Sequence, residues 1–164
     1  MTCIVGLVDG GKVYIGGDSA AVAGESIEMR SNRKVFRKGV FVIGFTGSYR
    51  VGQLMQYKMG ASAPATGGDL MVHMVTKFAK ELKKVGGDEI DELLVGHAGR
   101  LFKIGADYSI GEYASYTAAG AGAQYALGRL HGGAGGPEDR LRAALEAAQT
   151  HCAGVRAPFH IEVA

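Results

Sequence analysis

Residues 2–18, TCIVGLVDGGKVYIGGD, predict a β-hairpin at the beginning of the chain. Two apolar runs flank Asp9-Gly10-Gly11, and these residue types are the ones that tight hairpin turns favour. A hairpin returns the chain to the point where it started. We therefore expect Asp18, which follows the second run, to lie beside Thr2, which precedes the first.

The composition is that of an ordinary globular protein. Of 164 residues, 47% are apolar and 21% are charged, which predicts one folded domain over residues 1–164. No apolar run approaches the roughly 20 residues of a spanning helix, and the first residues lack the features of a signal peptide. A net charge of +2 without an arginine–aromatic patch argues against nucleic-acid binding. We expect a cytoplasmic protein with no membrane partner, in which Cys3 and Cys152 form no disulfide framework.

Runs of strands alternate with pairs of helices along the chain. Apolar alternation between turn residues predicts strands, and a 3.6-residue apolar repeat predicts helices. Strands are expected over residues 3–8, 12–17, 25–30, 34–37, 40–45, 92–98, 100–105, 109–115 and 159–163. Helices are expected over residues 49–59, 69–85, 123–130 and 137–152. Segregated runs of this kind suggest an α+β fold in which helix pairs cover two antiparallel sheets.

The segment 69–85 gives the clearest helical pattern. Asp69 can cap its start, and Gly86-Gly87 can end it. Its apolar residues repeat at helical spacing and predict one buried face, made of Met71, Met74, Val75, Phe78 and Leu82.

Several familiar catalytic motifs are absent from the sequence. It has no phosphate-binding P-loop, no His-Glu-x-x-His pair and no serine-hydrolase elbow. The five histidines show no metal-ligand spacing. We therefore expect neither a metal nor a cofactor.

Thr2 is a candidate nucleophile. Removal of Met1 is efficient when the next residue is small, so Thr2 can become the N-terminal residue without cleavage of a propeptide. An N-terminal threonine carries a hydroxyl and, in its α-amine, a base whose pKa is about 7.7–8.0. The alternative is an ordinary threonine at the second position.

Asp18 and Lys34 are the residues that can tune such an amine. A lysine beside the amine holds down its pKa by like-charge repulsion, and an aspartate keeps that lysine charged and oriented. At about 4 Å and an effective dielectric constant of about 20 this repulsion is near 4 kcal/mol, enough to shift the pKa by a unit or more. The alternatives are a turn residue for Asp18 and a solvated surface charge for Lys34.

Four short segments carry a resemblance to a known family. The segments Thr2-Cys-Ile-Val-Gly, Ile15-Gly-Gly-Asp18, Arg33-Lys34-Val35 and Gly44-Phe-Thr-Gly47 resemble proteasome β subunits. They are more similar still to the peptidase of the bacterial heat-shock-locus ATP-dependent protease. In that family a threonine, an aspartate and a lysine recur at equal intervals, and here 18 − 2 and 34 − 18 both equal 16.

The resemblance implies a fold and a chemistry. The fold would be the four-layer αββα sandwich of N-terminal-nucleophile hydrolases, with two antiparallel sheets. Thr2 would be nucleophile and base, Lys34 would tune its pKa, and Asp18 would orient Lys34. Gly47 would donate its backbone N–H to the oxyanion. The residues implied to bind substrate are Phe45, Tyr49 and Val22.

The resemblance also implies partners. Substrates would be peptides or unfolded proteins, and family members assemble into stacked hexameric or heptameric rings, so a homo-oligomer is expected. An ATPase partner would fit the family, although no docking residues for it are identified in the sequence.

Two positions depart from the family pattern. The family's serine after the second block of strands falls at Ala121, and residues 150–155 lack an aspartate and a serine that assist proton transfer around the threonine amine. Two other functions therefore stay open: an inactive proteasome-like scaffold, and an amidase of the same class that acts on a small amide. The aromatic side chains of Phe45 and Tyr49 favour peptides.

Overall fold

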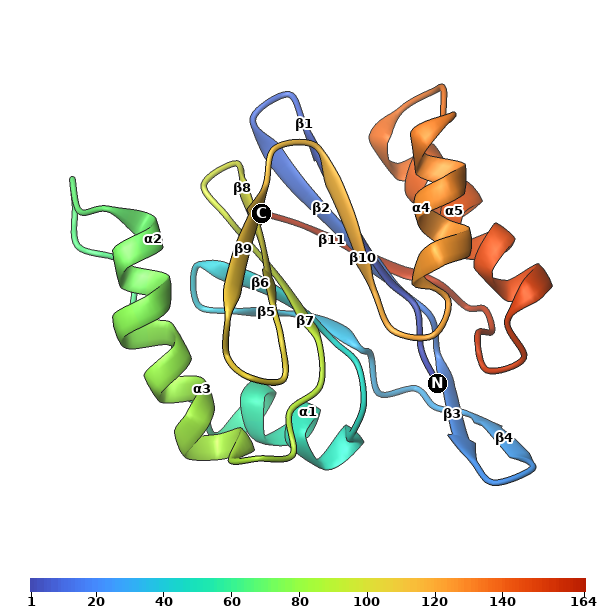
Figure 1. Ribbon diagram of the computed structural model, residues 1–164, viewed down its shortest axis with the longest axis horizontal. Helices are drawn as coiled ribbons and strands as arrows, with labels where there is room; N and C mark the ends of the chain where they lie inside the picture. The colour runs from blue at the N-terminus through green and yellow to red at the C-terminus, as the bar shows by residue number, and fades with distance from the viewer.

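The computed structural model describes residues 1–164, and the predicted N-terminal hairpin forms the middle of a four-stranded antiparallel sheet (Figure 1). Asp9 pairs with Lys12, so Gly10 and Gly11 make a two-residue turn, both with positive φ. The order of strands in this sheet is β10-β1-β2-β11. The strands are β1 (Ile4–Asp9), β2 (Lys12–Gly17), β10 (Tyr116–Ala119) and β11 (His160–Val163).

A second antiparallel sheet has five strands in the order β5-β6-β7-β8-β9. Its strands are β5 (Val35–Lys38), β6 (Phe41–Phe45), β7 (Leu93–His97), β8 (Arg100–Ile104) and β9 (Ile110–Tyr113). A separate two-stranded hairpin, β3 (Ala20–Ala23) and β4 (Ser26–Met29), projects from the body of the molecule near the N-terminus (Figure 1).

The helices fall into two groups on opposite sides of the sheets (Figure 1). The first group is α1 (Tyr49–Tyr57), α2 (Leu70–His73), the π-helical turn η1 (Met74–Phe78) and α3 (Ala79–Gly86). The second is α4 (Ala123–His131) and α5 (Pro137–His151). The predicted cap is confirmed, because Asp69 accepts hydrogen bonds from the backbone N–H groups of Met71 and Val72. The predicted stop is also confirmed, with Gly87 after the end of α3.

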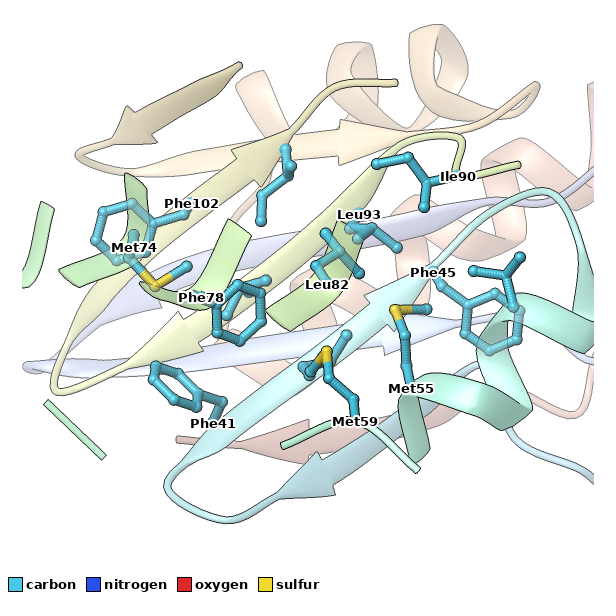
Figure 2. Packing of buried hydrophobic residues seen from close by; sticks show 14 of the residues in the cluster. Phe41, Phe45, Met55, Met59, Met74, Phe78, Leu82, Ile90, Leu93 and Phe102 are labelled. Atoms are coloured by element: carbon cyan, nitrogen blue, oxygen red, sulfur yellow. The ribbon is translucent and has the colours of Figure 1, made fainter. Parts of the chain in front are cut away.

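Three apolar clusters hold the elements together. One lies between the five-stranded sheet and the first group of helices, where Phe41, Phe78 and Phe102 pack with methionine side chains (Figure 2). A second joins α4 and α5 to the four-stranded sheet through residues such as Val5 and Leu145. A third draws side chains from both sheets. Burial of these side chains fixes the position at which β1 begins, Ile4, and Thr2 lies two residues before it.

The structure corrects three sequence-based expectations. Strands β3 and β10 were not predicted, whereas the strand expected over residues 109–115 is confirmed with shorter bounds, as β9. The two missed strands, AAVA in β3 and YTAA in β10, consist mostly of small residues without alternation of polar and apolar side chains. They form because a partner strand is available, β4 for β3 and β1 for β10. Val75 was expected on the buried face but is 54% exposed, since the π-helical turn contains more residues than an α-helical one and shifts the register of the side chains.

Gly44 tests the packing between the two sheets. A Cβ at Gly44 would lie 2.5 Å from Cγ2 of Ile4 and 3.0 Å from Cγ2 of Ile15. We expect Gly44→Ala to lower the free energy of unfolding by about 1–3 kcal/mol, since overpacking in a close-packed core costs that much. Gly128, in α4, has nothing within 4 Å of its Cβ position. Gly128→Ala should raise stability by up to about 1 kcal/mol through helix propensity. Chemical denaturation measures both, and equal effects would contradict this description of the packing.

Candidate active site

Thr2, Asp18 and Lys34 meet at the open end of the N-terminal hairpin. Lys34 Nζ donates to Thr2 Oγ1 at 3.1 Å and to Asp18 Oδ1 at 2.8 Å. All three residues are buried, with exposed fractions of 4%, 0% and 2% in chain order. The hairpin supplies Thr2 and Asp18, and Lys34 comes from the segment just before β5.

The carboxylate of Asp18 has hydrogen-bond donors on both oxygens. Oδ1 accepts from the backbone N–H of Cys3 at 3.1 Å, in addition to Lys34. Oδ2 accepts from the N–H of Ala20 at 3.0 Å and of Arg156 at 3.4 Å. A buried charge is tolerated when it is paired and hydrogen-bonded in this way. Asp18 therefore joins the start of β1, the start of β3 and the C-terminal segment at one point.

Two opposing effects set the protonation of Lys34. Burial lowers the pKa of Lys34 below its ordinary 10.5, while the charge and the hydrogen bond of Asp18 raise it, and burial is the larger effect. The ammonium group contacts the hydroxyl of Thr2 directly. It therefore acts on the atoms that a threonine nucleophile would use.

The backbone of Thr2 is held by the loop between β10 and α4. Gly122 donates its N–H to the carbonyl oxygen of Thr2 at 3.2 Å. Gly120 has a φ of +87°, and a Cβ there would lie 2.5 Å from the same oxygen. Only glycine fits both the conformation and the space. Ala121 lies between them, exposed and without a hydroxyl group.

Gly47 lies after β6, next to Thr46, whose Cγ2 would be 3.1 Å from a Cβ at Gly120. The φ of Gly47 is +75°, and a Cβ there would lie 2.8 Å from Cβ of Asp91. Gly47 and Thr2 line the same cavity. A backbone N–H in such a position is a candidate donor to an oxyanion.

The cavity beside Thr2 has a volume of about 300 Å³. Its wall consists of Met1, Thr2, Ala20, Ala21, Val22, Ala23, Ser26, Glu28, Arg30, Gly47 and Tyr49. Two of the three residues proposed from the sequence to bind substrate, Val22 and Tyr49, are therefore part of it. Phe45 is not; it is buried behind the wall, with its ring 5.8 Å from that of Tyr49 in an edge-to-face contact. Phe45 therefore packs behind Tyr49 and supports its ring.

Arg30, in the wall of the cavity, packs against the ring of Tyr49. The guanidinium of Arg30 lies 4.7 Å from the centre of the Tyr49 ring, within the range of a cation–π contact. Burial raises the pKa of the Tyr49 hydroxyl to about 12, so the phenol is neutral near pH 7. The sequence did not identify Arg30 or Glu28 as site residues, because their role depends on the projecting β3–β4 hairpin, only half of which was predicted.

Met1 precedes Thr2 and contacts the site. Thr2 Oγ1 donates to the carbonyl oxygen of Met1 at 2.6 Å. A Cβ at Gly154 would overlap the Met1 side chain, so the C-terminal segment lies against residue 1. With Met1 attached, the nitrogen of Thr2 is an amide and cannot serve as a base.

No group of three or more His, Cys, Asp or Glu side chains is placed to hold a metal ion. None of the helices has both the length and the apolar character needed to cross a membrane.

Comparisons with known proteins show the fold. No family model matches the chain, and no curated protein matches it. Among solved structures, the BPH protein of Thiobacillus denitrificans, in complex with epoxomicin, has a TM-score of 0.82 at 17% identity, with 99% of this chain and 97% of that chain covered. The eukaryotic HslV protein of Trypanosoma brucei has a TM-score of 0.75 at 19% identity, with 98% of each chain covered.

A third solved structure extends the same comparison. Anbu (ancestral beta-subunit) of Yersinia bercovieri has a TM-score of 0.73 at 14% identity, with 100% of this chain and 81% of that chain covered. Similarity at this level of identity establishes architecture and not chemistry. The chain has a proteasome-like N-terminal-nucleophile hydrolase fold.

Proposed function

We propose that the protein is a threonine-type endopeptidase whose nucleophile is Thr2 once the residue before it has been removed. The observation that supports this most directly is the contact of one buried ammonium group, Lys34 Nζ, with both the Thr2 hydroxyl at 3.1 Å and the Asp18 carboxylate at 2.8 Å. The second acceptor of this ammonium group is thus the hydroxyl that would act as the nucleophile. The arrangement fits an activated N-terminal threonine.

The reaction follows from the positions of these groups. The free amine of Thr2 takes the proton from Oγ1, which attacks the carbonyl carbon of a peptide lying in the cavity. The positive charge of Lys34 keeps part of the amine in its neutral, basic form. The N–H of Gly47 stabilises the oxyanion of the tetrahedral intermediate. The α-ammonium of Thr2 returns its proton to the leaving nitrogen as the tetrahedral intermediate collapses, which expels the amine product and leaves an ester on Thr2. A water molecule activated by the α-amine then hydrolyses this ester.

The fold and the cavity support a peptide substrate. We propose that residues 1–164 form a single domain with the four-layer αββα arrangement, in which the two sheets face each other through one apolar cluster and each carries a helix group. Val22 and Tyr49 provide an apolar and an aromatic wall beside the nucleophile. An unfolded or extended peptide can reach such a wall from the side of the β3–β4 hairpin.

A non-catalytic scaffold is the second candidate. Ala121 stands in the loop that touches Thr2 and supplies no hydroxyl group for proton transfer. This single observation favours the alternative, and the labelling experiment below separates the two.

We propose further that the protein forms a homo-oligomeric ring. Large apolar side chains are exposed on two separate faces, with Ile27 and Met29 on the projecting hairpin and Val72 and Val75 on the α2–η1 segment. We expect light scattering at micromolar concentration to give a mass several times 17.1 kDa. A persistent monomer would contradict the ring while leaving the fold unaffected. An ATPase partner stays a prediction from the sequence.

The nucleophile can be identified by covalent labelling. An α′,β′-epoxyketone peptide reacts with the hydroxyl and the amine of one residue, so an internal serine or cysteine cannot give the same ring adduct. We expect epoxomicin, which is bound in the solved BPH complex, to add its mass to the Thr2 peptide of protein from which residue 1 has been removed. Thr2→Ala and protein that retains Met1 are the controls, and neither should be labelled or cleave fluorogenic peptides. Protein with a confirmed free Thr2 that resists a panel of such probes would support the scaffold.

Lys34 gives a second test. We expect Lys34→Ala to abolish activity and to lower stability by about 3–5 kcal/mol, because it leaves Asp18 buried and unpaired. Lys77→Ala, on an exposed helical face, should change neither. The double variant Asp18→Asn/Lys34→Met removes both charges, and it should recover stability without recovering activity. Recovered activity in the double variant would show that the ion pair is only structural.

The protonation state of Lys34 sets an upper pH limit for the proposed activity. Lys34 is charged below its pKa and neutral above it, and burial lowers that pKa from 10.5. The charge that contacts the Thr2 hydroxyl and pairs with Asp18 is therefore present near neutral pH and is lost as pH rises. At alkaline pH the α-amine is already neutral, so the loss acts through the hydroxyl and through the unpaired Asp18. In the wild-type protein, activity per folded molecule should fall on an alkaline limb centred below pH 10.5.

A further inference from the structure

Glu92 contacts both loops that flank Thr2. It lies just before β7, between the Thr46–Gly47 segment and the Gly120–Gly122 loop. Neither the sequence motifs nor the reaction described above includes it. Its hydrogen bonds nevertheless connect the candidate oxyanion donor with the backbone that holds the nucleophile.

The main chain of Glu92 is bonded reciprocally to Thr46. The carbonyl oxygen of Glu92 accepts from the Thr46 N–H at 3.0 Å and from Thr46 Oγ1 at 2.9 Å. The N–H of Glu92 donates to the same Oγ1 at 3.1 Å. Thr46 is buried and directly precedes Gly47. The position of the Gly47 N–H therefore depends on where Glu92 lies.

The side chain of Glu92 reaches the other loop. Oε2 accepts from the N–H of Gly120 at 2.9 Å, and Oε1 pairs with Lys103 Nζ at 2.6 Å. Lys103 also donates to the carbonyl oxygen of Ala118, in β10. Burial by itself would raise the pKa of Glu92, but the hydrogen bonds from Lys103 and Gly120 lower it below its ordinary value, so the carboxylate is charged near pH 7.

The geometry points to Glu92 as a positioning residue for the threonine chemistry: it fixes the Gly47 loop and the Gly120–Gly122 loop relative to each other, beside Thr2. This inference rests on the proposed function. Gly122 holds the carbonyl oxygen of Thr2, and Gly120 closes against the same atom. A shift of either loop would move the oxyanion donor or the nucleophile away from its partner.

The hydrogen bond between Gly120 and Glu92 is important because the Gly120–Gly122 loop is rich in glycine. The Gly120–Gly122 loop has no side chain beyond a methyl group with which to anchor itself, since its middle residue is Ala121. Glycine-rich backbone is conformationally permissive, so an external hydrogen bond must select one conformation. The Glu92 carboxylate, itself oriented by Lys103, provides that bond.

Glu112 provides a matched control for substitution of Glu92. Both glutamates are paired with a basic residue of β8, Glu92 with Lys103 and Glu112 with Arg100. The side chains are also exposed to nearly the same extent, 35% and 34%. Glu112, in contrast, has no bond to either loop beside Thr2.

The test compares Glu92→Ala, Glu92→Gln and Glu112→Ala, each with Thr2 confirmed as N-terminal. We expect Glu92→Ala to lower kcat and the rate of epoxomicin labelling by about 10- to 100-fold, since small misplacements of reacting groups have effects of that size. KM should change by less than about threefold, because substrate-binding walls are untouched. Glu92→Gln keeps an acceptor for the Gly120 N–H and should recover most of the rate. Glu112→Ala should match the wild-type protein.

Amide hydrogen exchange gives a readout that is independent of activity. The Gly120 amide should exchange faster in Glu92→Ala than in the wild-type protein or in Glu112→Ala, while amides of the central strands stay protected. If the alanine variant does not fold, Glu92→Met, which has similar length but no oxygen acceptor, replaces it.

The outcomes separate the two proposals. Unchanged exchange at Gly120, an unchanged kcat, or a glutamine variant as slow as the alanine one would overturn the role of Glu92. A wild-type protein that neither cleaves peptides nor is labelled would contradict the proposed function, and the exchange data would still decide whether Glu92 holds the two loops.

Discussion

The ion pair between Lys34 and Asp18 is the constraint on which the site is built. Both side chains are 1% exposed or less, and their charged atoms lie 2.8 Å apart. Removing two charges from water costs several kcal/mol each, and their attraction offsets this only with good geometry and further hydrogen bonds. The backbone N–H groups of Cys3, Ala20 and Arg156 supply those bonds. The ion pair is tolerated because three separate segments converge on it.

That convergence links the fold to the chemistry. The apolar clusters on both faces of the N-terminal sheet bury the start of β1 and the end of β2, so the residues at their shared end cannot relax into solvent. Thr2 is thus rigid before any substrate arrives. Rigid placement of this kind lowers the entropic cost of bringing reacting groups together. Burial of Cys3 in the same strand raises the pKa of its thiol to about 12, which makes it an unreactive neighbour for the threonine.

Glycine residues allow the backbone to pack closely around the site. Gly47 and Gly120 each combine a positive φ with a space too small for a Cβ. Gly120 can therefore approach the carbonyl oxygen of Thr2, and Gly47 can approach Asp91, more closely than any other residue would permit. The same permissiveness leaves both loops in need of anchors. The Thr46 side chain, next to Gly47, is hydrogen-bonded to the main chain of Glu92, and the Glu92 carboxylate accepts from the N–H of Gly120. The loops are shaped by their own sequence and held by residues distant from it.

The sequence by itself determined the local features of this protein. The turn at Asp9-Gly10-Gly11, the cap at Asp69 and the apolar repeats are set by neighbouring residues, so the main strands and helices could be predicted. The spacing of Thr2, Asp18 and Lys34 was also visible, and the hairpin explains why the first two meet. Only the tertiary structure decided that β3 and β10 exist, that Val75 is exposed, and that Arg30 and Glu92 lie beside the site. These features depend on contacts between segments far apart in the chain, and local patterns carry no information about them.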